Sequence, residues 1–277
     1  MMIDTHHHLW NYNLEEYRWM DDSMSVLKRD YLPDELEQEL QKAGITGTVV
    51  IQARQSLEET RWLLKLADEH WFIEGVVGWL DLRSKGLERE LEVFATHSKL
   101  VGVRHVIHDE PDDDFMLCPD FIKGIAQLER FDLVYDLLLF PRHLGRAAEL
   151  VKAFPRQRFV LDHMGKPQIK TGKIEPWKTE LEKLAVHSNV WCKLSGMVTE
   201  ADHKLWQYKE LLPYIETVLN TFGPERIMLG SDWPVCRLAG AYSEVLGIVL
   251  KFIESMDETD RTKILYQNAI DCYQLKN

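Results

Sequence analysis

Eight short apolar segments, each followed by an amphipathic helical pattern, place the strongest limit on how this chain of 277 residues can fold. The segments are rich in Val, Ile, Leu, Phe and Trp, which is typical of parallel strands buried on both faces. They cover residues 2–8, 46–53, 72–80, 100–107, 133–140, 158–164, 190–196 and 226–233. Eight strands that alternate with helices favour an α/β fold, the (β/α)8 TIM barrel. A doubly wound open sheet is the alternative, but no GxGxxG or P-loop motif follows any strand.

The segments between these strands have the periodicity of amphipathic helices. Residues 33–43 begin with a proline, which suits a first helical turn, and stop before Gly44. Ser56 and Glu59 have the spacing of a capping box at the start of a helix over residues 56–70. The other predicted helices cover residues 87–97, 121–128, 142–154, 176–187, 205–222, 242–256 and 258–273. No repeat, low-complexity segment or linker interrupts the pattern, so we expect one domain over residues 1–277, with a long irregular stretch at residues 11–31.

Charge and cysteine content narrow the partners and the location of the protein. The formal net charge is -12 and no Lys/Arg-rich run occurs, which disfavours nucleic acid and anionic membrane surfaces as partners. No apolar stretch reaches 18 residues, so we expect no membrane-spanning helix. The four cysteines are widely spaced, and the start of the chain is acidic and histidine-rich, unlike a signal peptide. We therefore expect a reduced, cytoplasmic protein; its oligomeric state is open, and a homodimer is compatible with the sequence.

A histidine-rich strand at residues 2–8 is the first candidate for chemistry. Side chains alternate between the two faces of a strand, so Asp4, His6 and His8 are expected to share one face. Two imidazoles about 6–7 Å apart can converge on one ion or on a polarised substrate atom. An expression tag is the alternative explanation, but a tag normally has more histidines and a Gly/Ser scar.

The ends of the other strands extend this site, because a TIM barrel carries its active site at the carboxyl ends of its strands. Polar candidates at these ends are Gln52, Arg104, Asp162, His163, Lys193, Ser195 and Asp232. Histidines and an aspartate at the ends of the first, sixth and eighth strands form a specific pattern. A random set of strand ends would be mostly Thr, Asn, Gly and Ser.

This pattern resembles the amidohydrolase superfamily. The motifs, in chain order, are DTHHHLW from Asp4, IQA from Ile51, GVRH from Gly102, LDHMGKP from Leu161, CKLSG from Cys192 and GSDWP from Gly230. Together they resemble most closely its sugar-lactonase branch, which includes L-fuconolactonases and L-rhamnono-lactonases. The resemblance implies a TIM barrel and a hydrolase that opens a sugar-derived aldonolactone, such as L-fuconolactone or L-rhamnonolactone.

The sequence departs from the binuclear members of that superfamily. Those members use a carboxylated Lys or a Glu as a bridging ligand and a histidine on the fifth strand, whereas this chain has Arg104 on the fourth strand and Tyr135 and Asp136 on the fifth. An Arg cannot ligate a cation, so two metal ions are not expected. Two possibilities stay open. One divalent ion, zinc or manganese, is held by His6 and His8 together with His163 or Asp232, or no metal is required.

The resemblance assigns roles within this set. Asp232 is the expected general base, which takes a proton from the attacking water. The lactone carbonyl is polarised by a metal on His6 and His8 or, without one, by His163 and Arg104. The residues expected to hold the substrate are Trp10, Gln52, Lys166 and Trp233.

Each assignment has a structural alternative. Asp232 could cap a turn, His163 could be a hydrogen-bonded core residue, and Arg104 could pair with Asp136 or another buried acid. The strand-end lysines, Lys166 and Lys193, could extend to solvent, and the two tryptophans could serve packing alone. At the level of function, the alternatives are a metal-dependent decarboxylase or an amide hydrolase of the same superfamily, and a non-catalytic sugar- or metal-binding barrel.

Overall fold

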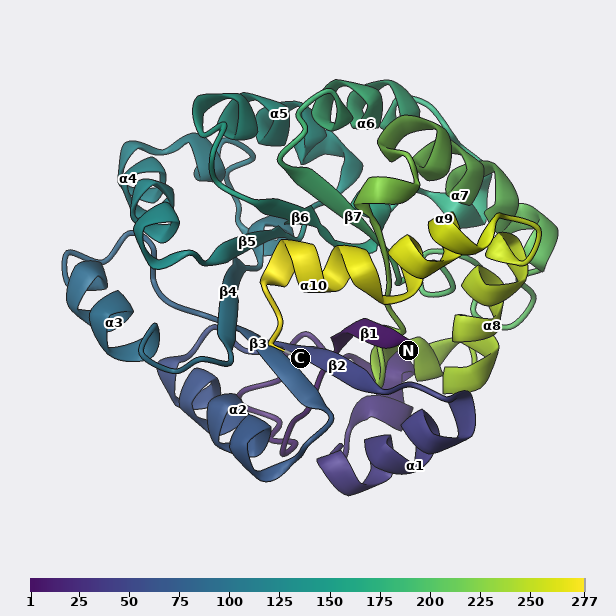
Figure 1. Cartoon of the computed structure of the whole chain (residues 1–277), viewed down its shortest axis with the longest axis horizontal. Helices are drawn as coiled ribbons and strands as arrows, with labels where there is room; N and C mark the ends of the chain where they lie inside the picture. The colour runs from purple at the N-terminus through teal and green to yellow at the C-terminus, as the bar shows by residue number, and fades with distance from the viewer. Residues whose placement is uncertain (277) are drawn as a thin grey trace.

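The computed structural model describes residues 1–276; Asn277, the last residue of the expected domain, lies outside them. Eight parallel strands form one sheet in chain order, and β1 lies against β8 (Figure 1). The strands are β1 (Ile3–His7), β2 (Gly47–Ile51), β3 (Ile73–Gly78), β4 (Leu100–His105), β5 (Val134–Leu137), β6 (Phe159–Leu161), β7 (Val190–Leu194) and β8 (Ile227–Leu229). The predicted TIM barrel is confirmed.

An outer ring of helices surrounds the strands (Figure 1). The α-helices are α1 (Pro33–Ala43), α2 (Leu57–Glu69), α3 (Leu87–Phe94), α4 (Pro119–Leu128), α5 (Leu144–Ala153), α6 (Trp177–Ala185), α7 (Tyr208–Phe222), α8 (Tyr242–Ile253), α9 (Glu258–Thr262) and α10 (Asn268–Tyr273). Ser56 caps α2 as predicted, because its side chain accepts a hydrogen bond from the backbone N–H of Glu59 at 3.0 Å. The last predicted helix is divided in three, since a π-helical turn at Lys263–Gln267 separates α9 from α10.

The helix α10 closes one end of the barrel. Its residues Cys272 and Tyr273 pack against Ile3, Val134 and Met228, which lie inside the barrel near the beginnings of their strands. Figure 1 shows α10 crossing the middle of the ring of strands. The amino-terminal end of the barrel is therefore filled, and the carboxyl ends of the strands are left to form a site.

The contact between β1 and β8 depends on a buried side chain. Asp4 accepts hydrogen bonds from the backbone N–H of Ser231 at 2.9 Å, from the Ser231 hydroxyl at 2.6 Å and from the Tyr242 hydroxyl of α8 at 3.0 Å. The prediction that Asp4 shares a face with His6 and His8 is therefore wrong: Asp4 points towards the outer helix. The register of β1 against β2 shifts between Asp4 and His7, and this irregularity breaks the simple alternation.

None of the helices in residues 1–276 is long and apolar enough to cross a membrane. The four cysteines are all free, and three of them are buried.

Candidate metal and active site

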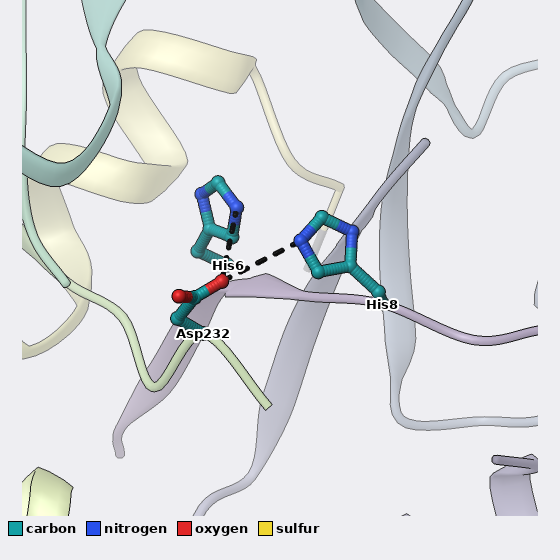
Figure 2. Close-up of side chains that lie close together, drawn as sticks. All are labelled: His6, His8 and Asp232. Carbon is teal, nitrogen blue, oxygen red and sulfur yellow. Dashed lines mark ion pairs between the residues drawn. The ribbon is translucent and has the colours of Figure 1, made fainter. Parts of the chain in front are cut away.

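Three histidines face one carboxylate oxygen at the carboxyl end of the barrel. Asp232 Oδ1 lies 3.5 Å from Nε2 of His8, 3.9 Å from Nε2 of His6 and 3.8 Å from Nε2 of His163. Figure 2 shows His6 and His8 pointing towards Asp232 from the neighbouring strand. The structure thus brings together all four residues that the sequence predicted as metal ligands.

Each of the three rings has a polar partner on its far side from Asp232, and for His8 this partner fixes the tautomer. His8 Nδ1 lies 2.8 Å from the carbonyl oxygen of Ile51, which can only accept, so Nδ1 carries the proton and Nε2 keeps its lone pair. His6 Nδ1 lies 3.2 Å from Oδ1 of Asp162 and 3.4 Å from the Lys193 ammonium. His163 Nδ1 lies 2.9 Å from the Ser195 hydroxyl. A carbonyl or carboxylate behind the ring is the usual support of a metal-ligating histidine.

The donor set suits a divalent metal ion. His6, His8 and Asp232 offer two imidazole nitrogens and one carboxylate oxygen, all within 4.8 Å of one another. Ligands at about 2.1 Å from a tetrahedral zinc lie about 3.4 Å apart, close to the distances of 3.5 and 3.9 Å between these nitrogens and Asp232 Oδ1. His163, on the other side of Asp232, is a further donor at this position.

The protonation states also suit ligand or base chemistry. Burial lowers the pKa of His6 and of His163 well below the usual range, so both rings are neutral at neutral pH. Burial alone would raise the pKa of Asp232, but the facing His163 and His8 outweigh it and hold that pKa below its ordinary value. Neutral imidazoles around an ionised carboxylate are the forms that bind a cation.

Beneath this cluster lies a chain of buried ion pairs. Asp162 accepts from Arg104 Nη1 at 2.9 Å and lies 3.0 Å from the Lys193 ammonium. Lys193 also lies 2.5 Å from Asp136, whose carboxylate accepts from the Tyr273 hydroxyl of α10 at 2.8 Å. The interpretation of Lys193 as a solvent-directed lysine is wrong, because its side chain is fully buried. Arg104 pairs with Asp162, not with Asp136.

Sequence reasoning missed this second layer. Asp162 is a strand-end candidate to which the sequence assigns no role, although it lies 3.2 Å from His6 and pairs with both buried cations. A signal was present: Asp136 and Lys193 each lie within a strand predicted to be buried on both faces. A buried charge requires a partner, so the two could have been paired from the sequence.

The loop after β2 brings Gln52 and Glu59 to the edge of the site. Arg104 Nη2 donates to Gln52 Oε1 at 3.0 Å, and the amide nitrogen of Gln52 is buried without a hydrogen-bond partner. Glu59 Oε2 accepts from the backbone N–H groups of Ala53 and Arg54 at 3.0 and 2.7 Å. Burial raises the pKa of Glu59 to about 7. Glu59 thus holds the backbone that follows Gln52, and the amide NH2 group of Gln52 is left for a ligand.

Three site residues have strained backbones. His163, Lys166 and Asp232 have φ values of 53°, 51° and 60°, in the left-handed region that non-glycine residues rarely occupy. Such conformations persist only where the surroundings enforce them, and they cluster at functional sites. Gly196 packs beside His163: a Cβ there would lie 2.6 Å from His163 Nδ1. This glycine is required for the close approach of the loop after β7.

The predicted substrate-binding side chains lie around this centre. Lys166 follows His163 on the same turn and forms an ion pair with Glu200. Trp10 and Trp233 are 0% and 1% exposed, and both pack against Tyr31, with ring centroids 5.5 and 5.2 Å from it. The Trp10 indole N–H donates to the carbonyl of Arg29 at 2.8 Å. Both indoles therefore have packing roles in this structure, and stacking on a substrate stays a prediction.

Comparison with known proteins agrees with the motifs. The family model described as Amidohydrolase matches residues 3–275. The chain belongs to the amidohydrolase family. This amidohydrolase is 39% identical to the L-fucono-1,5-lactonase of Burkholderia multivorans, over 99% of the chain and 96% of that protein. It is 26% identical to the L-rhamnono-gamma-lactonase of Scheffersomyces stipitis, over 71% of the chain and 67% of that protein.

A solved structure gives the same fold. It is an amidohydrolase from Burkholderia multivorans with bound zinc; the TM-score is 0.95, the identity 37%, and both chains are covered to 100%. The resemblance to the amidohydrolase superfamily is therefore confirmed. That relative contains zinc, and in this chain His6, His8 and Asp232 form a group that could hold a divalent metal ion.

Proposed function

We propose that this amidohydrolase hydrolyses a sugar-derived lactone, an aldonolactone such as L-fuconolactone or L-rhamnonolactone. The observation that carries the proposal is the Asp232 carboxylate surrounded by the Nε2 atoms of three histidines at the carboxyl end of the barrel. The names of the two lactonase relatives support the substrate class. They differ in the sugar, so the sugar and the ring size stay undecided.

In the proposed reaction, Asp232 acts as the general base. Its lowered pKa keeps it ionised at neutral pH, so it can accept a proton from a water molecule that attacks the lactone carbonyl. The bond from the carbonyl carbon to the ring oxygen then breaks, and Asp232 returns the proton to the departing oxygen. The product is a hydroxy acid, which ionises and releases one proton to solvent.

A divalent ion on His6, His8 and Asp232 would polarise the carbonyl and increase the acidity of the water. We propose zinc, with manganese as the alternative. His163 lies on the other side of Asp232 and can donate or accept through Nε2, whereas Arg104 supplies positive charge while its Nη atoms bind Asp162 and Gln52. If no metal is required, these two residues stabilise the oxyanion.

The substrate hydroxyls and ring are assigned to residues at the edge of the site. The amide nitrogen of Gln52 and Nε of Arg104 are buried without a hydrogen-bond partner, and a buried donor of this kind favours a ligand oxygen. Lys166 supplies further N–H donors, while Trp10 and Trp233 support the wall behind His8 and Asp232.

A pH-indicator assay tests the proposal, because each turnover releases one proton. A panel of five- and six-membered aldonolactones is offered to metal-stripped protein and to protein restored with Zn²⁺ or Mn²⁺, with the rate without protein subtracted. Activity that returns only with metal supports the ion on His6 and His8, whereas activity unaffected by stripping supports catalysis by Asp232, His163 and Arg104 alone. Silence in every condition would refute the lactonase proposal and favour the decarboxylase or the non-catalytic barrel.

We also propose a cytoplasmic location, supported by the four free cysteines. A homodimer stays a prediction, which light scattering on the purified protein would test.

A further inference from the structure

An ion pair joins the two loops that support the histidine at the wall of the site. Lys166 follows His163 on the turn after β6, and its backbone N–H donates to the carbonyl of His163 at 2.8 Å. Its ammonium group binds the carboxylate of Glu200, on the segment after β7. Ser195 and Gly196, which contact the ring of His163, begin that segment. The pair therefore lies directly beside the proposed reaction centre.

The pair also lines a cavity of about 440 Å³. Phe140, Lys166, Trp177 and Glu200 are among its walls, so the loops after β5, β6 and β7 all contribute. This volume lies within the range of pockets that hold small molecules. The side chains of Lys166 and Glu200 are only 17% and 19% exposed. Their charges are consequently screened less than those of a surface pair.

The charge of Lys166 acts on the reaction centre. Burial does most to lower the pKa of His163, and the positive charge of Lys166 lowers it further. The other buried cations next to the site are also paired: Arg104 binds Asp162, and Lys193 binds Asp136 and Asp162. Arg142 and Lys173 also line the cavity, and Arg142 pairs with Asp113. A substrate carboxylate that binds at Lys166 would share that ammonium with Glu200, and two carboxylates at one ammonium repel each other. A hydroxyl can bond to the remaining N–H groups without such repulsion.

We propose that Glu200 sets the charge selectivity of the site: by neutralising Lys166, it favours uncharged lactones over lactones that carry a free carboxylate. This inference rests on the proposed lactone hydrolysis and names the substrate class within it. Glu200 contacts Lys166, so it acts on the substrate through that lysine.

The test compares two lactones of the same sugar, an aldonolactone and the aldarolactone that carries a carboxylate at the far carbon. The measured quantity is the ratio of kcat/KM for the charged lactone to kcat/KM for the uncharged one, in holoenzyme. Glu200→Gln keeps a carbonyl oxygen for Lys166 but removes the charge, and it should raise the ratio about ten-fold, mainly through KM of the charged lactone. Lys166→Gln leaves Glu200 unpaired and should lower the ratio.

Asp202→Asn is the matched control. Asp202 lies 3.7 Å from Lys170 and connects the same two loops outside the cavity, so this variant should leave the ratio unchanged. In the double variant Lys166→Gln/Glu200→Gln, the increase in this ratio that Glu200→Gln causes should disappear.

The inference is overturned if the wild type prefers the charged lactone, if Glu200→Gln leaves the ratio unchanged, if Asp202→Asn raises it equally, or if the gain persists without Lys166. Thermal melts verify folding. If Glu200→Gln does not fold, Lys166→Gln still tests the inference, because it should lower the ratio. Failure of the wild type to open either lactone would refute the proposed function itself.

Discussion

The buried carboxyl of Glu59 gives the protein a stability that falls as pH rises. Glu59 is fully enclosed beside the loop that carries Gln52, and burial raises its pKa from 4.5 to about 7. Below pH 4.5 the group is protonated in both the folded and the unfolded chain. Between pH 4.5 and 7 only the folded chain holds the proton, so the free energy of unfolding decreases as pH rises through this window. At 1.36 kcal/mol per pKa unit, the full loss is about 3 kcal/mol.

Glu59→Gln should remove this dependence while keeping an acceptor for the backbone N–H groups of Ala53 and Arg54. Urea unfolding of wild type and variant is measured at several values between pH 4.5 and 8. The stability of the variant relative to wild type should rise by about 3 kcal/mol across this range, because shared effects of other groups cancel. Glu58→Gln, an exposed change on the same helix, controls for loss of a carboxylate from α2. A difference that stays constant with pH would refute the reasoning.

Five further substitutions test the site. Asp232→Asn should lower kcat at least a hundred-fold with an unchanged melting temperature; full activity would remove the base assignment. His8→Gln should weaken zinc binding at least ten-fold, measured by metal content after dialysis. His7→Gln should not, because His7 Nε2 contacts Thr48 at 3.0 Å and faces away; equal loss in both variants would contradict the ligand set. Lys193→Met should destabilise the fold by about 3–5 kcal/mol in urea unfolding, since it leaves the buried carboxylates of Asp136 and Asp162 without this partner. An unchanged stability would show that these carboxylates do not depend on Lys193 for charge compensation. Gly196→Ala should lower both stability and kcat, because its Cβ would displace His163; an active variant of wild-type stability would contradict the close-packing argument.

The fold could be predicted because local pattern and global architecture agree. All eight predicted strands are present, and α1 has the predicted bounds from Pro33 to Ala43. The strands are shorter than predicted at several carboxyl ends: β6 stops at Leu161 and β8 at Leu229. Asp162, His163 and Asp232 follow these ends, and their side chains reach the site. Apolar content alone cannot show where pairing ends.

The candidate site was predicted in part for the same reason. His6, His8, His163 and Asp232 were identified by their places at strand ends, and the barrel brings them together. The orientation of Asp4 could not be predicted, because it depends on a register shift against β2. The interior position of Lys193 depends on Asp136 and on closure of the barrel by α10, contacts between segments distant in the sequence.

The β1–β8 contact has a consequence for how the protein folds. Asp4 and Ser231, whose hydrogen bonds join these strands, are 227 residues apart in the chain, and His6 and Asp232 lie beside them on the same two segments. Contacts of such long sequence separation form late, because the chain must first close a very large loop. The proposed catalytic cluster therefore exists only in molecules whose barrel has closed. During refolding, activity should return only in molecules with a completed barrel. It should therefore recover later than the helical circular dichroism signal, because local helices form earlier.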